Sequence, residues 1–204
     1  MVKDVPKIKL FNRWSFDDVA VTDPSLKRYI NLRPIIVPKT GGRHAKTQFH
    51  KSNLNIVERF INKLMVPGHQ GKKHLLTSGR CTGKTFTIIK IVEKVFEELE
   101  KRTKTNPIQV LVRAIENAAP REEITSYQIG GIIARKAVVT SPQRRVDIAL
   151  RHICQAAYRK AFGKKISMVD ALVEEILGAY NNDPSKSFAI KEKERVEREA
   201  EGAR

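Results

Sequence analysis

The sequence has little cysteine and no long apolar run. Its 204 residues include two cysteines, Cys81 and Cys154, too few for a disulfide framework or a structural zinc site. No apolar run reaches the roughly 18 residues that a membrane-spanning helix needs, and Met1–Asp4 does not begin a signal peptide. The sequence therefore predicts a cytoplasmic protein in a reducing compartment, with no membrane partner.

Catalytic and metal-binding motifs are absent as well. None of the five histidines belongs to an HExxH pair or to a Cys/His ligand set, and no GxSxG elbow is present. The adjacent pairs Glu122-Glu123 and Glu174-Glu175 place their carboxylates in different directions, so neither pair can share one substrate. We predict no catalytic residue, no bound metal and no cofactor.

One segment, Gly79–Thr85, resembles the P-loop of nucleotide hydrolases without meeting its requirements. Three residues separate its two glycines where the P-loop has four. The preceding residues do not form a buried strand, and no later strand ends in an aspartate that could hold magnesium. The pattern favours a basic, glycine-rich loop that contacts phosphate groups over one that hydrolyses a nucleotide.

Acidic residues are outnumbered. Lys and Arg total 39 against 22 Asp and Glu, a net charge of +17 with a pI near 10.1. The basic residues gather in three stretches, 39–51, 59–94 and 135–165, whereas residues 168–183 contain four acids and no base. A protein that is merely soluble mixes the two signs, so this segregation indicates a surface that binds a polyanion, and nucleic acid is the leading partner.

Residues 1–51 form an irregular N-terminal segment that we expect to wrap over a core built elsewhere and to contact nucleic acid. Prolines and Gly41-Gly42 interrupt its apolar runs, and the only predicted strand is Ile35–Val37. The aromatic residues Phe11, Trp14 and Phe16 could stack on bases or anchor the segment on the core, and anchoring is the favoured interpretation.

Residues 52–204 have mainly helical periodicity. The sequence predicts helices from the N-cap Ser52 to Pro67, over 84–101, 107–118 and 142–162, from the capping box at Ser167 to about Tyr180, and over 188–199. Residues 68–83 read as a loop. Residues 124–140 are β-rich, and Gly130-Gly131 forms either a hairpin turn or a bulge in one long arm. The predicted fold is mainly α: a bundle of about six helices with a protruding β-hairpin and a basic, irregular N-terminal arm.

The candidate nucleic-acid-binding residues are the basic side chains of the arm, the glycine-rich loop, the helix faces opposite the apolar stripes, the hairpin and the C-terminus. Arginine's planar fork suits phosphate and guanine edges. The candidates are Arg43, His44, Lys46, Lys51, Arg59, Lys63, Lys72, Lys73, Arg80, Lys84, Arg113, Arg135, Lys136, Arg144, Arg145, Arg151, Arg159, Lys160 and Arg204.

Several stretches, in order along almost the whole chain, carry a family resemblance. They are Trp14–Phe16, Asp23–Leu32, Gly41–Ala45, Asn55–Arg59, Gly71–Leu75, Asn106–Glu123, Ser141–His152 and Ser187–Lys191. On these motifs the chain resembles the universal small-subunit ribosomal protein seven (protein five in eukaryotic numbering), in its archaeal form. The segment 76–86 looks like an extra loop that many members lack.

The resemblance implies a structural protein that binds the 3′ major domain of small-subunit ribosomal RNA and nucleates the subunit's head. It would lie near the exit-site tRNA, the messenger RNA exit channel and neighbouring ribosomal proteins. Composition alone leaves a second reading open, an architectural DNA-binding protein, because a helical body with a basic β-arm is also typical of minor-groove benders. The ordered motifs favour the ribosomal reading.

Overall fold

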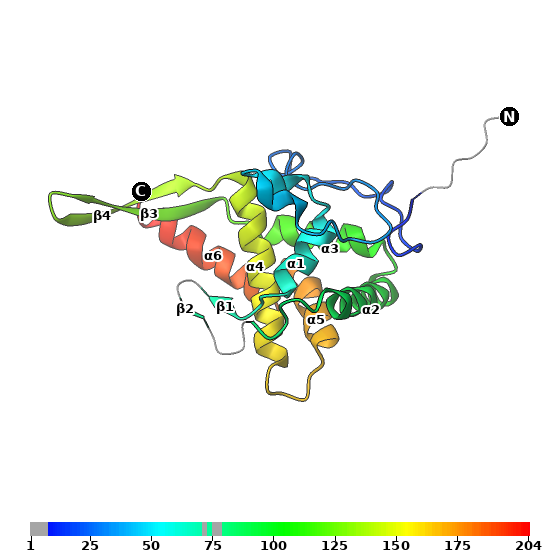
Figure 1. Ribbon diagram of the computed structural model, residues 1–204. Helices are drawn as coiled ribbons and strands as arrows, with labels where there is room; N and C mark the ends of the chain where they lie inside the picture. Colours follow the sequence, from blue (N-terminus) through cyan, green and yellow to red (C-terminus); the bar gives the residue numbers. More distant parts are fainter. Residues whose placement is uncertain (1–7, 71–72, 75–78) are drawn as a thin grey trace.

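The computed structural model of the protein describes residues 8–70, 73–74 and 79–204. These residues form six α-helices gathered in one bundle, with a β-hairpin that projects from one side of it (Figure 1). The mainly α fold class with a protruding hairpin is confirmed. The helices are α1 Ile56–Leu64, α2 Thr85–Thr103, α3 Pro107–Ala118, α4 Pro142–Ala161, α5 Met168–Tyr180 and α6 Phe188–Glu201.

The core lies where the apolar stripes of the helices meet. Helix α5 is central to the bundle and contacts α2, α3 and α4. Every apolar position expected to face inward on α2 and on α4 is buried. Burial of such stripes is the main stabilising contribution to a bundle of this kind. The stripes on α2 are Ile88, Ile89, Val92, Val95, Phe96 and Leu99, and on α4 they are Val146, Ala149, Leu150, Ile153, Ala156 and Ala157.

The aromatic residues near the N-terminus anchor this segment on the bundle, as favoured from the sequence. Trp14 and Phe16 are buried, and the Trp14 ring packs edge-on against Phe96 of α2 with centroids 5.6 Å apart. The Trp14 indole Nε1 donates a hydrogen bond of 3.1 Å to Glu100 Oε2, which satisfies its polar atom. The stacking alternative is therefore wrong for these two rings in the folded protein.

The strand expected at Ile35–Val37 does not form. This segment is a bend with Ile36 and Val37 exposed, and one backbone bond, from Phe11 N to Ile36 O, ties it down. A β-prone triplet becomes a strand only when a neighbouring strand pairs with it, and none does so within the described residues.

The start of α1 also differs from the prediction. Asn55, not Ser52, is the N-cap: its side chain accepts a hydrogen bond of 2.9 Å from Val57 N. Asn55 Nδ2 also donates to Arg33 O, so the cap joins α1 to the N-terminal segment. Two short 3-10 helices, Arg43–Lys46 and His50–Asn53, precede it, and Ser52 lies in the second.

The projecting hairpin consists of β3, Glu122–Ile129, and β4, Ile132–Val139, paired antiparallel in continuous register. Gly130 and Gly131 are its two-residue turn, with φ of 53° and 89°. A positive φ at both central positions is the requirement of a type I′ turn, which glycine meets without strain. The turn interpretation is thus correct and the bulge interpretation is wrong. A minor two-residue ladder, β1 His69–Gln70 with β2 Lys73–His74, lies within the segment predicted as a loop.

Helix α6 is held against α5 by a buried carboxylate. Ser167 caps α5 as predicted, its hydroxyl accepting from Asp170 N. Glu175 is fully buried, and its Oε1 accepts hydrogen bonds from Ser187 Oγ at 2.7 Å and from Ala189 N at 3.0 Å, at the first turn of α6. A Cβ at Gly178 would lie 3.0 Å from Ser187 N, so α5 and the start of α6 approach as closely as glycine allows.

Candidate nucleic-acid interface

Residues from the N-terminal segment, α1 and α4 come together around a hollow of about 250 Å³. Lys51 comes from the second 3-10 helix, Arg59 and Lys63 from α1, and Arg151 from α4. Asp147 is the one carboxylate among the described residues that line this hollow. All four basic residues were predicted to bind, and so was His44, which also lines it.

The four cations are crowded together. Asp147 receives two of them: Arg59 Nη2 lies 2.9 Å from its Oδ1, and Lys51 Nζ contacts its Oδ2. Burial, and after it the neighbouring Arg151, lower the pKa of Lys63 below its ordinary value. The loss of solvation and the neighbouring cation therefore both destabilise the protonated Lys63. An anion in the hollow would reverse this effect.

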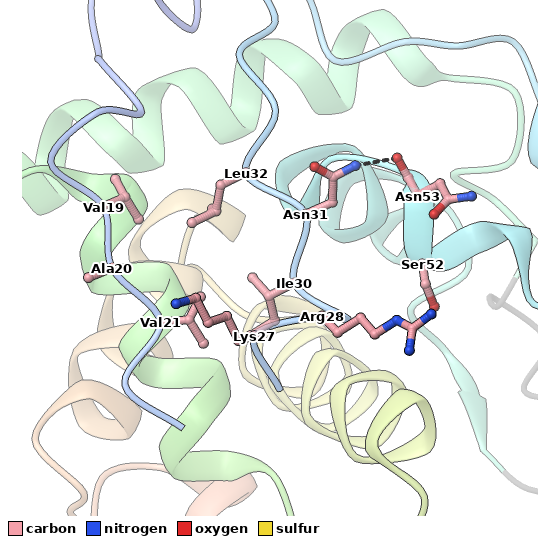
Figure 2. A pocket seen from close by; sticks show the side chains of 10 residues that line it. All are labelled: Val19, Ala20, Val21, Lys27, Arg28, Ile30, Asn31, Leu32, Ser52 and Asn53. Atoms are coloured by element: carbon pink, nitrogen blue, oxygen red, sulfur yellow. Dashed lines mark hydrogen bonds between the residues drawn. The ribbon is translucent and has the colours of Figure 1, made fainter. Parts of the chain in front are cut away.

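Two further hollows continue the same surface, one of about 490 Å³ and one of about 540 Å³. We call the hollow described above the Lys63 hollow. The first of the two further hollows shares His44 and Leu54 with it and adds Arg33, Arg43 and His50. The second shares Asn31 and Asn53 with the first and adds Lys27 and Arg28. Figure 2 shows Arg28 extending toward Ser52, with Val19–Val21 facing Ile30–Leu32 across the opening.

We call the basic residues of these three hollows, apart from the buried Arg59, the basic band. Within the described residues Asp147 is the only acidic side chain that lines any of the three. A concave surface of one sign focuses the electrostatic potential and attracts phosphate. The basic band consists of Lys27, Arg28, Arg33, Arg43, His44, His50, Lys51, Lys63 and Arg151.

Sequence reasoning missed Lys27, Arg28, Arg33 and His50. The Lys-Arg pair at 27–28 was a visible signal, but it lies in a segment without periodicity that could assign it a face. The structure supplies the missing information: residues 26–30 form turns in which Leu26 and Ile30 are buried while Lys27 and Arg28 are exposed.

Arg59 and Arg145 lie in the interior. Beside its pair with Asp147, Arg59 donates to Tyr29 O at 2.9 Å, and its side chain is 4% exposed. Arg145 donates to Pro120 O at 3.1 Å, to Asp23 Oδ2 at 2.9 Å and to Ser25 Oγ. A phosphate would have to displace these partners, so we assign both arginines to the fold and not to the binding surface.

Arg144 and Arg204 are exposed and paired with carboxylates at the base of the hairpin. Arg144 forms a two-pronged pair with Glu123, at 2.6 and 2.7 Å. Arg204 Nη2 contacts both oxygens of Glu122 at 2.6 Å, so the C-terminus lies against β3, as Figure 1 shows. These pairs fix the hairpin base to α4 and to the end of the chain.

Three other predicted residues have intramolecular partners outside the basic band. Arg113 of α3 donates to Thr22 Oγ1 at 3.0 Å and lies 3.6 Å from Glu116 Oε2. Near the end of α4, Arg159 lies over the Phe188 ring, 5.0 Å from its centroid. Lys160 contacts Lys186 O at 3.2 Å and the buried Glu175 at 3.3 Å.

The remaining candidates are scattered. Lys46 is exposed on the first 3-10 helix, and Arg80 and Lys84 are exposed just before α2. Arg135 and Lys136 are exposed on β4, where successive side chains point to opposite faces of the ribbon, so they do not share one face. Lys72 lies outside the described residues, as does the side chain of Lys73.

The glycine-rich segment leads into α2 as the sequence indicates. Gly83 has a φ of 78°, and Lys84 is the N-cap position of α2 without a side-chain capping bond. The sheets within the described residues are two-stranded and antiparallel. A P-loop instead follows a strand of a parallel sheet.

In residues 8–70, 73–74 and 79–204, no group of three His, Cys, Asp or Glu side chains is arranged to hold a metal ion. None of the helices described in the structure combines the length and the apolar character that a membrane crossing requires.

Comparison with known proteins identifies a family and a similar relative. The profile of the family described as "Ribosomal protein S7p/S5e" matches residues 26–204. The small ribosomal subunit protein uS7 of Nanoarchaeum equitans (strain Kin4-M) is 52% identical over 198 residues, which cover 97% of this chain and 100% of that protein. Its archaeal source agrees with the archaeal form indicated by the motifs. The chain belongs to the ribosomal protein S7p/S5e family.

Proposed function

We propose that this protein is a structural component of the small ribosomal subunit in the cytoplasm and binds the 3′ major domain of its ribosomal RNA. The observation that carries the proposal is the basic band, a hollowed surface lined by seven Lys and Arg residues and, within the described residues, by one carboxylate, Asp147. Family membership and the name of the Nanoarchaeum relative support the assignment to the small subunit.

The proposed role in assembly follows from the way in which the band is built. It joins the N-terminal segment to α1 and α4, so an RNA bound there contacts elements far apart in the sequence. A rigid helical body that binds several RNA phosphates at once holds the RNA strands in a fixed arrangement. We infer that the protein nucleates folding of the subunit's head in this way, together with neighbouring ribosomal proteins.

The hairpin is proposed to serve a second purpose, near the exit-site tRNA and the messenger RNA exit channel. The hairpin projects beyond the bundle (Figure 1), and its exposed side chains include Arg135, Lys136 and Tyr127. Exposed aromatic and basic side chains on a projecting ribbon suit contacts with RNA that binds and leaves.

Binding to a transcript of the 3′ major domain tests the proposal. Lys63→Gln and Arg151→Gln each remove one positive charge from the basic band, and each should weaken binding several-fold in a filter assay at about 100 mM salt. Arg102→Gln, which removes an exposed charge of α2 outside the band, is the matched control.

Two results would contradict the proposal. One is equal weakening by all three substitutions, since this would show only an effect of net charge. The other is equal affinity for the transcript and for duplex DNA of the same length, which would favour the architectural DNA-binding alternative. Co-sedimentation of the wild-type protein with small subunits through a high-salt sucrose gradient tests the assignment independently.

A further inference from the structure

A separate hollow, of about 920 Å³, lies between α3, the start of α4, the α5–α6 turn and α6. It shares no lining residue with the three hollows of the basic band. Residues 22–25 of the N-terminal segment and the base of the hairpin complete its walls. Neither the sequence motifs nor the basic band assigns it a role.

A buried hydroxyl without a partner lines this hollow. Thr140 is 2% exposed, and among the described residues its Oγ1 has no hydrogen-bond partner. Its backbone is fixed, because Thr140 N donates to Arg121 O at 2.9 Å. A buried hydroxyl that lacks a partner destabilises the fold, and such groups are rare unless a ligand or an ordered water completes them.

The start of α4 adds donors at the same wall. Thr140 directly precedes the N-cap Ser141, whose side chain makes no capping hydrogen bond, and the first turn of α4 contains no acidic residue. Pro142, the first residue of the helix, also lines the hollow. The first N–H groups of a helix lack intrahelical partners and carry partial positive charge, so this end of α4 suits an anion.

The charged lining is positive. Arg113, Arg121, Arg145 and Lys193 line the hollow with two acids, Asp23 and Glu116. Asp23 accepts from Arg145, and Glu116 Oε1 accepts from Thr22 N at 2.6 Å and from Asp23 N at 2.8 Å. Glu116 Oε2 lies 3.6 Å from Arg113 Nη1 and has no hydrogen-bond partner among the described residues. Burial lowers the pKa of Lys193, whose Nζ donates to Asn117 O at 2.8 Å. A bound anion would offset the excess positive charge.

We propose that this hollow binds one unstacked nucleotide of the ribosomal RNA, with its phosphate at the start of α4 beside Thr140 and Arg121. The inference rests on the proposed function and adds a subsite for a single nucleotide to it. Its volume exceeds what a phosphate alone needs. Tyr180 at the end of α5 supplies a ring, and Asn181 and Asn182 of the α5–α6 turn supply two amide side chains. Such groups bind the face and the edge of an unpaired base.

Thr140→Val is the decisive substitution, because it removes the hydroxyl and keeps the shape of the side chain. If Thr140 served only the fold, the loss of an unpartnered buried hydroxyl would leave stability unchanged or raise it, without affecting RNA. We expect unchanged or higher resistance to urea together with about tenfold weaker binding of the 3′ major-domain transcript, the loss expected for one hydrogen bond to a charged acceptor. Ser126→Ala, which removes an exposed hydroxyl from β3, is the control.

The salt dependence of binding and ultraviolet cross-linking provide two further tests. Arg121→Gln should weaken binding and reduce the slope of log K against log salt by about 1, whereas Thr140→Val should leave that slope unchanged. In a transcript carrying 4-thiouridine, ultraviolet cross-links should map to the peptide that contains Tyr180–Asn182.

The outcomes separate this inference from the proposed function. If Lys63→Gln weakens binding while Thr140→Val and Arg121→Gln do not, the protein binds the RNA but the hollow does not, and the inference is overturned. If Thr140→Val impairs incorporation into subunits without affecting the isolated transcript, the hollow receives a protein segment and the inference is again wrong. If the wild-type protein fails to bind the transcript, the proposed function itself fails.

Discussion

Arg144 and Arg145 are neighbours in the sequence and have opposite surroundings in the structure. Arg144 is exposed and pairs with Glu123, whereas Arg145 is buried and donates to Asp23, Ser25 and Pro120. Exposed pairs contribute little to stability, and removal of one partner from a buried network leaves polar atoms without hydrogen bonds.

We therefore expect Arg145→Ala to lower the free energy of unfolding by about 2 to 4 kcal/mol and Arg144→Ala by less than about 1 kcal/mol. Urea denaturation of the two variants measures the difference. Equal losses would show that the Asp23–Arg145 contact does not hold the N-terminal segment. If Arg145→Ala destabilises the fold as expected, a binding defect in a variant that carries both changes must be corrected for its unfolded fraction.

His152 should make stability depend on pH. Burial lowers its pKa from 6.5 to about 4, and Arg151, Arg195 and Arg159 act in the same direction against Glu192. Between these pH values the unfolded chain binds a proton that the folded chain does not, so stability falls as the pH drops from about 6.5 to about 4. At pH 5 the loss from this residue is about 2 kcal/mol relative to pH 7.

Urea unfolding at pH 7 and pH 5 tests this expectation. His152→Gln should lose less stability between the two values than the wild type, whereas His50→Gln, at an exposed position, should keep the wild-type difference. The same pH dependence in all three proteins would assign it to other groups.

At the residue scale the sequence identified cations but not their partners. The list of candidates contained every basic residue of the Lys63 hollow, because clusters of charge are visible in the sequence. It could not separate Arg59 and Arg145 from their exposed neighbours, because their partners Asp147 and Asp23 lie 88 and 122 positions away. Which arginine is buried depends on tertiary contacts.

At the scale of elements, the hairpin is attached by its base and not by its tip. Glu122 and Glu123 of β3 contact Arg204 and Arg144, whereas Ile129, Ile132 and Ile133 near the turn are 63%, 75% and 70% exposed. The helical body should therefore fold and bind RNA without the tip.

Replacing residues 126–135 with an Asn-Gly turn keeps Thr125 opposite Lys136 and removes the outer half of the hairpin. We expect nearly normal incorporation into small subunits, measured by co-sedimentation, and altered exit-site tRNA occupancy or start-site fidelity. Lys63→Gln combined with Arg151→Gln should instead reduce incorporation into small subunits, without altering exit-site tRNA occupancy or start-site fidelity in the subunits that form. If the shortened hairpin blocked incorporation while the double substitution did not, this division of roles would be reversed.

Elements with strong periodicity could be predicted from the sequence, and those set by contacts could not. The residues of α3 and the apolar stripes of α2 and α4 agree with the prediction, since repeated three- and four-residue spacing is a local signal. The start of α1 depends on Asn55 meeting Arg33 of the N-terminal segment, and the short β1–β2 ladder has no strand-like pattern of its own.

At the scale of the whole molecule, one part of the positive charge is gathered in the basic band. The seven Lys and Arg residues of the basic band should neutralise up to seven phosphates, and log K for the RNA should then fall with log salt with a slope of about −5 to −6. A filter-binding series from about 50 to 400 mM salt measures it. A slope shallower than about −2 would mean that the band does not face the RNA backbone.

The hairpin has a consequence for the protein before it is assembled. Among the described strands β3 and β4 pair only with each other, so the outer side of each strand has backbone N–H and C=O groups outside the ladder. Such edges, with exposed isoleucines beside the turn, are templates for further strands and favour self-association. Repulsion between chains of net charge +17 opposes that association. A short polyanion that neutralises the charge without covering the ribbon would remove this repulsion. We therefore expect the isolated protein to aggregate least when it is fully charged or when it is assembled with its RNA.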